Sequence, residues 1–305
     1  MRRTLVVIVL LALAAAPALL SPWGLSQLTF VAIYIVAGTG LMLLAGHAGQ
    51  LSLCHAAFIG VGAYVEAILH ARGWPLPVSL LSATILASVT GIVAAWPARK
   101  LSGIYLAIAT LSFGFIVQEI FMRWESVTGG NAGLAVANLD AGRFYWLALA
   151  ASLGALWLLG RLLAGRLGRA FIALREDMTA ATAIGIAVPR VKVTAFALAA
   201  AFGGLAGALY AHQLRFVSPE QFDWVMSIEL LMMLVIGGLG TRAGIVIGAV
   251  FLIVLPQAIA LLRDGLGWVT PPAGIELFAF GFALVLTLRY APAGLAGWLG
   301  KSASL

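Results

Sequence analysis

The chain has 305 residues, of which 63% are hydrophobic and only 10% are charged, and its mean hydropathy is +1.07. Soluble domains carry about 25% charged residues, so this composition excludes a soluble protein. The net charge of +7 does not indicate nucleic-acid binding, because the basic residues lie between apolar segments, where they report membrane orientation. Long apolar runs favour helices over a β-barrel.

Windows of about twenty apolar residues predict about ten transmembrane helices, so the expected fold class is all-α and polytopic. We expect residues 1–305 to form a single transmembrane domain in the lipid bilayer, with broken or short helices near any transport path. The expected spans are 5–20, 28–45, 51–70, 78–97, 103–121, 144–163, 191–212, 225–239, 244–262 and 275–288.

The N-terminal segment has two interpretations. Arg2 and Arg3, the apolar run after them and the small residues 14–16 fit a cleaved signal peptide. The same features fit a first transmembrane helix whose basic end lies in the cytoplasm. We favour a retained helix because the next apolar segment begins almost at once.

Lysine and arginine concentrate in alternate loops, which are cytoplasmic by the positive-inside rule. Ten spans with both chain ends in the cytoplasm satisfy this rule. The most basic loop, 164–190, is then cytoplasmic, and the loops 122–143 and 213–225 lie outside.

A polar break lies between the second and third expected spans. Residues 46–64 hold small and polar side chains inside an apolar run, 28–69, that is too long for one crossing. Polar backbone at membrane depth is tolerated only inside protein or beside water. The break is therefore either a tight turn at one membrane face or part of a transport path. The sequence does not fix the depth of the break in the membrane. A third helix that entered and left on the same side would place the break away from the cytoplasmic face.

Polar and small residues in and near the break are the candidates for lining such a path. His55 and Glu66 are eleven residues apart, about three helical turns, and so share one face of a helix. Ionisable groups at this depth cost about 2.5 to 3.5 kcal/mol, so each needs a partner or water, and a packing role competes with solute contact. The path candidates are Gly49, Gln50, Ser52, Cys54, His55, Tyr64, Tyr105 and Thr110.

Motifs for catalysis are absent from the sequence. It contains no phosphate-binding loop, no His-Glu-x-x-His and no Gly-x-Ser-x-Gly. The chain therefore cannot itself bind ATP in the P-loop manner, and we predict no enzymatic activity, no cofactor and no metal. Cys54 is the single cysteine, which excludes an intrachain disulfide and any multi-cysteine metal site.

The most polar segment, 168–186, is expected to form one short amphipathic helix that stops at Gly185. Such a helix either lies on the lipid surface or docks its apolar face into a groove of a soluble partner. The mixed charges at 175–177 favour the protein partner. The apolar face carries Phe171, Leu174, Met178 and Ala181 at helical spacing.

Five motifs occur in an order that resembles the membrane permeases of branched-chain amino acid ABC importers, and the chain looks like the LivM-like member of the LivH/LivM family. The resemblance covers about residues 28–288. The motifs lie at 49–58, 103–111, 128–130, 169–185 and 237–240.

This resemblance implies a permease subunit for branched-chain or related small amino acids in the bacterial cytoplasmic (inner) membrane. It implies a second, LivH-like permease, two cytoplasmic ATPase subunits and an extracytoplasmic solute-binding protein as partners. By the same resemblance, segment 168–185 is similar to a coupling helix that sits in an ATPase groove. The residues implied in coupling are Arg169, Phe171, Leu174, Arg175, Glu176, Met178 and Gly185.

Two departures from the family pattern bear on the solute. Cys54 stands where the family usually has Gly, and Asn131 and Ala132 stand where it commonly has Ser-Asn. Related permeases handle urea and short amides, which are alternative solutes. A stand-alone secondary transporter, driven by ions through groups such as Glu66 and His55, is the rival class.

Overall fold

The computed structural model describes residues 13–265 and 275–302 and is almost entirely helical. After a helical stretch at 13–19, the helices are α2 (Pro22–Leu41), η1 (Met42–His47), α3 (His55–Ala71), α4 (Leu76–Ala98), α5 (Gly103–Arg123), α6 (Glu125–Thr128), η2 (Gly130–Ala132), α7 (Ala141–Ala164), α8 (Arg166–Glu176), α9 (Met178–Ala183), α10 (Val188–Leu214), η3 (Pro219–Phe222), α11 (Trp224–Gly237), α12 (Arg242–Gly265), α13 (Ile275–Tyr290) and α14 (Gly294–Ser302). The strands are β1 (Leu134–Ala135) and β2 (Phe216–Val217).

The all-α, polytopic prediction is confirmed. Among the described residues, seven helices are long and apolar enough to cross a membrane. α3 and α11 are shorter, with 17 and 14 residues, or about 26 and 21 Å against a bilayer core of about 30 Å. Every expected span from the second onward corresponds to a helix. The first half of the first span, residues 5–12, lies outside the described residues.

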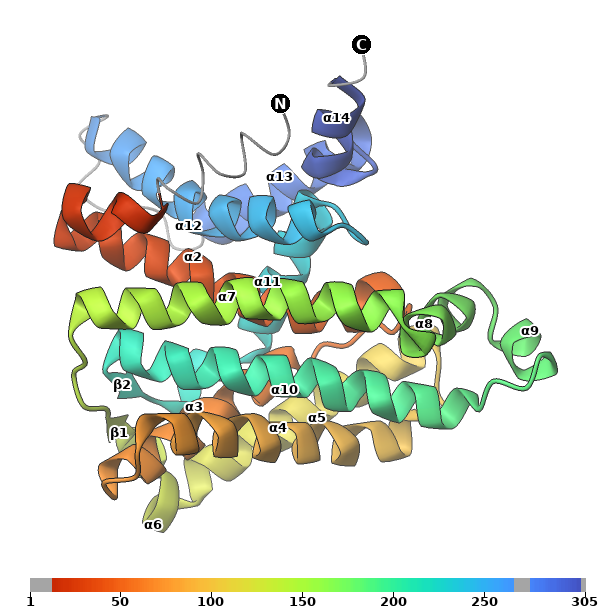
Figure 1. Cartoon of the computed structure of the whole chain (residues 1–305), viewed down its shortest axis with the longest axis horizontal. Helices are drawn as coiled ribbons and strands as arrows, with labels where there is room; N and C mark the ends of the chain where they lie inside the picture. Colours follow the sequence, from red (N-terminus) through yellow and green to blue (C-terminus); the bar gives the residue numbers. More distant parts are fainter. Residues whose placement is uncertain (1–12, 266–274, 303–305) are drawn as a thin grey trace.

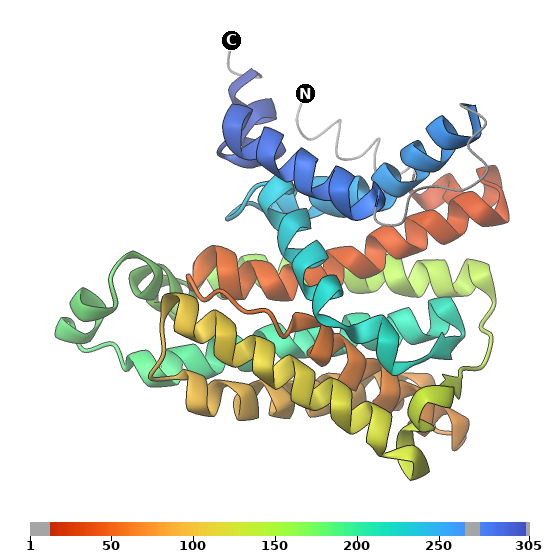
Figure 2. The same ribbon diagram turned by 180° about the vertical axis from the view of Figure 1, so that it is seen from behind.

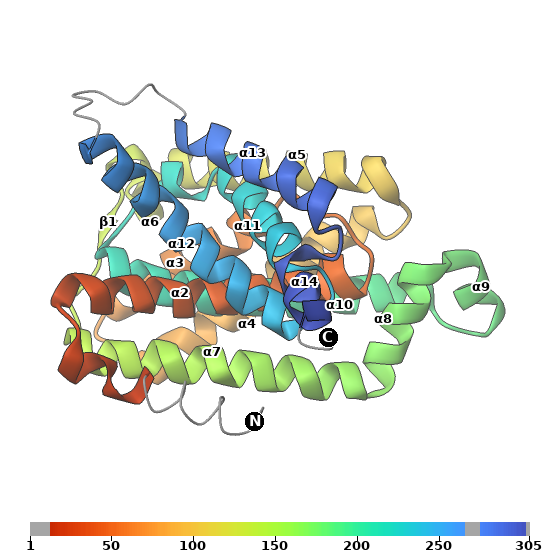
Figure 3. The same ribbon diagram turned by 90° about the horizontal axis from the view of Figure 1, so that it is seen from above.

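The long helices run side by side along one axis. Figure 1 shows α2, α7, α10 and α4 in this arrangement, with α12, α13 and α14 forming a layer beyond α2. Figure 3 shows that layer from above. α10 is central, because it packs against α2, α3 and α4. On the opposite face, α5 and the oblique α11 lie in front of α3 (Figure 2).

The two ends of the molecule differ. At one end, β1 and β2 form an antiparallel ribbon in which Leu134 pairs with Val217 and Ala135 with Phe216. The ribbon joins the segments 122–143 and 213–225. α8 and α9 project from the opposite end (Figure 1). We refer to these as the ribbon end and the α8 end.

Small residues let α10 approach its neighbours closely. A Cβ atom added at Gly207 would collide with the carbonyl oxygen of Ile59 in α3, and one at Gly204 would collide with the Cβ atom of Ala87 in α4. Close backbone approach of this kind drives helix association in lipid, where hydrophobic burial gives no advantage. The position of α3 therefore depends on α10.

We expect Gly207→Ala to lower the thermal unfolding temperature of the detergent-solubilised protein. The added methyl group must push α3 and α10 apart, and overpacking of this kind costs about 1–3 kcal/mol. Gly154→Ala in α7 is the control, because a Cβ atom there meets no described atom within 4 Å. Equal unfolding temperatures for the two variants would contradict the tight packing of α3 on α10.

Candidate functional site

The predicted break is a region where the chain leaves the helical conformation inside the bundle. α2 widens into the π-helical η1, residues 48–54 form no helix, and α3 begins only at His55, later than expected. Figure 2 shows this segment returning from the α8 end to the middle of the molecule, from which α3 runs toward the ribbon end. The break thus combines a turn at the α8 end with a non-helical return to the middle of the molecule (Figure 2).

Buried polar side chains of the break bind one another and two backbone carbonyls. Gln50, Ser52, Cys54 and His55 are all fully buried. Two buried atoms, Gln50 Oε1 and His55 Nδ1, have no hydrogen-bond partner in the described part of the chain. The contacts are Gln50 Nε2 to the Ala48 carbonyl (3.1 Å), Ser52 Oγ to Cys54 Sγ (3.3 Å) and His55 Nε2 to the Ala37 carbonyl (3.0 Å).

Three helices converge on the break. The Ala56 amide donates to Ser227 Oγ in α11 at 3.0 Å, and the Leu53 amide donates to Thr110 Oγ1 in α5 at 3.1 Å. The Asp223 side chain caps the first turn of α11. The N-termini of α3 and α11, which are the positive ends of their helix dipoles, therefore meet inside the bundle.

The space between these helices is nearly closed. A cavity of about 10 Å³ lies there, lined by residues of the break, α5, η3 and α11, among them Leu53, Gly114, Asp223 and Ser227. Such a volume holds about one water molecule. A solute of amino-acid size does not fit, so any path through this point is shut in this conformation.

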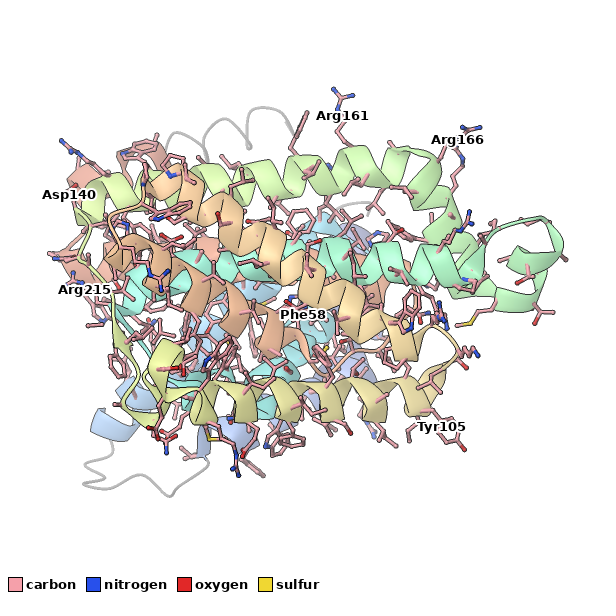
Figure 4. The ribbon with its side chains drawn as sticks, turned by 90° about the horizontal axis from the view of Figure 1, so that it is seen from below. Phe58, Tyr105, Asp140, Arg161, Arg166 and Arg215 are labelled. Atoms are coloured by element: carbon pink, nitrogen blue, oxygen red, sulfur yellow. The ribbon has the colours of Figure 1, made fainter. Side chains whose placement is uncertain are left out.

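The structure brings most of the predicted path residues together. Gly49, Gln50, Ser52, Cys54 and His55 belong to the break or the first turn of α3, and Thr110 binds it from α5. Tyr64 lies further along α3, between the rings of Phe121 and Phe222. Tyr105 does not join them. It is 71% exposed and points away from the molecule, whereas Phe58 lies in the middle (Figure 4).

A larger cavity, of about 380 Å³, lies between α2, α10, α11, α12 and α13. Its lining includes Tyr210 and Glu229, and the amides of Gln27 and Gln257 bind each other at its edge at 2.7 Å. Tyr210 packs against Phe222, which also lines the small cavity. Sequence motifs missed this cavity, because its lining comes from five separate helices.

The prediction of one helix over 168–186 is wrong. α8 ends at Glu176 and α9 begins at Met178, with an extended Asp177 between them. Asp177 Oδ1 accepts hydrogen bonds from the amides of Thr179 (2.6 Å) and Ala180 (3.0 Å). An aspartate in this position caps a new helix instead of continuing the old one.

The apolar face of this segment packs against its own chain. Phe171 and Leu174 are 0% and 1% exposed, and Ala181 is 2% exposed. Intramolecular packing thus already covers three of the four residues of the predicted apolar face, and Met178 is half-buried. The outward face instead carries Ile172 (47% exposed), Ile184 (74% exposed) and the exposed Arg169 and Glu176.

α8 touches the break directly. Arg175 Nη1 donates to the Gly46 carbonyl at 2.8 Å. Gly49 adopts a φ of +65°, and a Cβ atom added there would lie 3.0 Å from the Arg175 Cα atom. The Gly240 amide also lies 3.0 Å from Met42 Sδ in η1. The break thus contacts both α8 and the turn between α11 and α12.

Residues 25–288, which include the break, α8 and α11, match the family described as branched-chain amino acid transport system / permease component. The chain belongs to this family. It is 32% identical, over 96% of its length and 75% of the relative's, to the high-affinity branched-chain amino acid transport system permease protein LivM of Escherichia coli K12.

More distant relatives have related names. The autoinducer 2 import system permease protein LsrC of Salmonella paratyphi B is 28% identical over 78% of this chain and 72% of its own. The probable branched-chain amino acid transport permease protein LivM of Methanocaldococcus jannaschii is 26% identical over 72% of this chain and 68% of its own. No solved structure matches the chain. The permease is thus a multi-pass membrane subunit of an ABC importer and not an enzyme.

Asp177 gives α9 of the permease a pH dependence. Hydrogen bonds from the Ala180 and Thr179 amides lower the pKa of this carboxyl group. A lowered pKa means that the cap stabilises α9 above the ordinary aspartate pKa of about 3.9 and is lost as the pH falls through the folded-state value.

We expect hydrogen-exchange protection of residues 178–183, corrected for intrinsic rates, to fall in acid. Asp177→Asn should keep the cap but lose this pH dependence, since asparagine caps equally well and does not titrate. Asp177→Ala should lose protection at all pH values. Unchanged protection in Asp177→Ala would show that the cap does not hold α9.

Proposed function

We propose that the permease carries branched-chain or related small amino acids across the bacterial inner membrane, driven by ATP hydrolysis in two separate cytoplasmic ATPase subunits. The names of its LivM relatives support this solute class. The observation that carries the proposed coupling is the contact between Arg175 of α8 and the Gly46 carbonyl in the break. This contact links α8, which projects at one end of the molecule, to the interior of the bundle. The chain acts as one transmembrane domain.

The distribution of basic residues supports a cytoplasmic α8 end. Arg166 lies toward this end, whereas Asp140 and Arg215 lie at the ribbon end (Figure 4). Positive loops stay in the cytoplasm, so the ribbon end faces outside and the solute-binding protein approaches it. Basic residues at the α8 end include Arg99, Lys100, Arg161, Arg169, Arg175, Arg190 and Arg242.

The face formed by the break, α5 and α11 supports a second, LivH-like permease as partner. Leu51, within the non-helical segment, is 48% exposed, and Trp224 at the start of α11 is 46% exposed. Irregular backbone at membrane depth cannot face lipid, because its polar groups would lack partners there. A second permease covering this face would enclose the break and complete a path between the two subunits.

ATP hydrolysis in the cytoplasm then acts on the break through α8. The ATPases bind the outward face of α8 and α9, around Ile172 and Ile184, which are exposed. Phe171 and Leu174 anchor the segment to the rest of the permease. Displacement of α8 moves the break through Arg175 and Gly49, and the small cavity opens alternately to each side.

In vesicles that contain the permease, its second permease and the ATPases, with the binding protein added, we expect ATP-dependent leucine uptake. Arg175→Ala should lower uptake about tenfold or more at similar ATP hydrolysis, because a charge-assisted hydrogen bond contributes about 1.5–3 kcal/mol. Arg166→Ala is the control on the same helix, since its side chain points away from the molecule (Figure 4).

Three outcomes would contradict parts of this account. Uptake driven by an ion gradient without ATPases would favour a secondary transporter. Wild-type uptake by Arg175→Ala, with the complex intact, would remove the coupling role of its contact with Gly46. Uptake of urea in place of leucine would revise the solute while leaving the coupling mechanism in place.

We expect Ile172→Asp combined with Ile184→Asp to reduce co-purification of the ATPases with the permease. The charged groups would replace exposed apolar side chains that the partner desolvates. Ile172→Val with Ile184→Val is the control, because it keeps the apolar character. Equal recovery of the ATPases with both double variants would show that they bind elsewhere.

A further inference from the structure

Three side chains of types that can bind metals, one glutamate and two histidines, lie close together at the ribbon end of the bundle, away from the break. Glu66 and His70 lie one turn apart on α3, and His212 faces them from the last turns of α10. Each offers one ligand atom, and these atoms all lie within 4.8 Å of one another. We call these three residues the Glu66 cluster.

Burial leaves this cluster with unused lone pairs. Glu66 and His212 are 0% and 3% exposed. Glu66 Oε1 accepts a hydrogen bond from Ser79 Oγ at 2.8 Å and lies 2.9 Å from His212 Nε2. Glu66 Oε2 and His70 Nδ1 are buried and have no hydrogen-bond partner among the described residues. A buried carboxylate oxygen without a partner is costly, and a cation would satisfy it.

The surroundings orient these side chains as an outer shell orients metal ligands. His212 Nδ1 lies 3.4 Å from the Ala137 carbonyl, which follows β1, and its Nε2 lies 2.9 Å from Glu66 Oε1, so both ring nitrogens have a neighbour that fixes the orientation of the ring. Ser79 holds the carboxylate from α4. A histidine fixed by a carbonyl and a carboxylate fixed by a hydroxyl are the usual supports of metal-bound ligands.

The spacing fits a small divalent ion. Ligand atoms 2.0–2.2 Å from a tetrahedral metal stand about 3.4 Å apart. The separations in the cluster, from 2.9 Å to at most 4.8 Å, bracket this value. Two histidines and one carboxylate form a ligand set for Zn²⁺ that leaves a fourth position for water.

We propose that Glu66, His70 and His212 form a divalent transition-metal site, with Zn²⁺ as its occupant. The half-buried His70, next to the last residue of α3, gives the ion access from the ribbon end. The bound ion joins α3 to α10 and, through Ser79 and Ala137, to α4 and the ribbon. Spacing rules missed this site because His212 lies 146 residues from Glu66 in the sequence.

The test uses tag-free permease in detergent, stripped with a chelator and titrated with Zn²⁺ alone. We expect one Zn²⁺ per chain by calorimetry and elemental analysis, a rise in unfolding temperature with Zn²⁺, and a Co²⁺ absorption spectrum of a four-coordinate site. His70→Ala should weaken binding by more than about 100-fold and abolish the thermal shift, and Ser79→Ala should weaken binding about tenfold.

Controls keep the test decisive. His70→Ala removes a ring nitrogen that has no partner, so the metal-free fold should survive, which the unfolding temperature without Zn²⁺ verifies. His47→Ala, at the opposite end of the bundle, should bind Zn²⁺ like the wild type. The proposal is overturned if folded wild-type permease shows no saturable Zn²⁺ binding, or if His70→Ala and Glu66→Gln bind Zn²⁺ as tightly as the wild type.

Discussion

The architecture depends on one constraint: backbone that leaves the helical conformation at membrane depth must still find hydrogen-bond partners. The break meets this demand with groups from distant segments. The Leu53 amide uses Thr110 of α5, the Ala56 amide uses Ser227 of α11, and the Gly46 carbonyl uses Arg175 of α8. Each partner lies on a different helix. The hydrogen bonds that satisfy the backbone groups of the break therefore also fix the positions of α5, α8 and α11 around it.

These hydrogen bonds from other helices make the structure of the break depend on the positions of those helices. A hydrogen bond that stabilises a segment from another helix is lost or redirected when that helix shifts, and in a low-dielectric interior the cost of an unmade bond is high. A shift of α5, α8 or α11 would therefore cost the break a hydrogen bond unless the freed group found a new partner. On the other side of the break, close glycine contacts fix the position of α3 against α10.

Much of this fold was predictable from sequence, and the failures have physical causes. Apolar run length located the long apolar helices α2, α3, α4, α5, α7, α10, α11, α12 and α13. Gly185, with a φ of +84°, lies just beyond α9, where a helix stop was expected. Helical periodicity placed Phe171 and Leu174 on one face but could not say what covers that face, and the chain itself does. Tyr105 lies apart from the other path candidates, because composition does not tell which side of α5 faces inward. The cavity beside Glu229 and the role of Arg175 arise from long-range contacts that leave no local pattern.

The β1–β2 ribbon has a consequence for assembly. Its two strands are about 80 residues apart in sequence, and α7 to α10 lie between them. Closing a loop of this length costs entropy that is repaid only once the intervening helices are in place. The ribbon therefore forms after α10 has packed against the earlier helices, and it marks the completion of this end of the molecule. A chain stalled before that step would present two separate loops at this end in place of one ribbon.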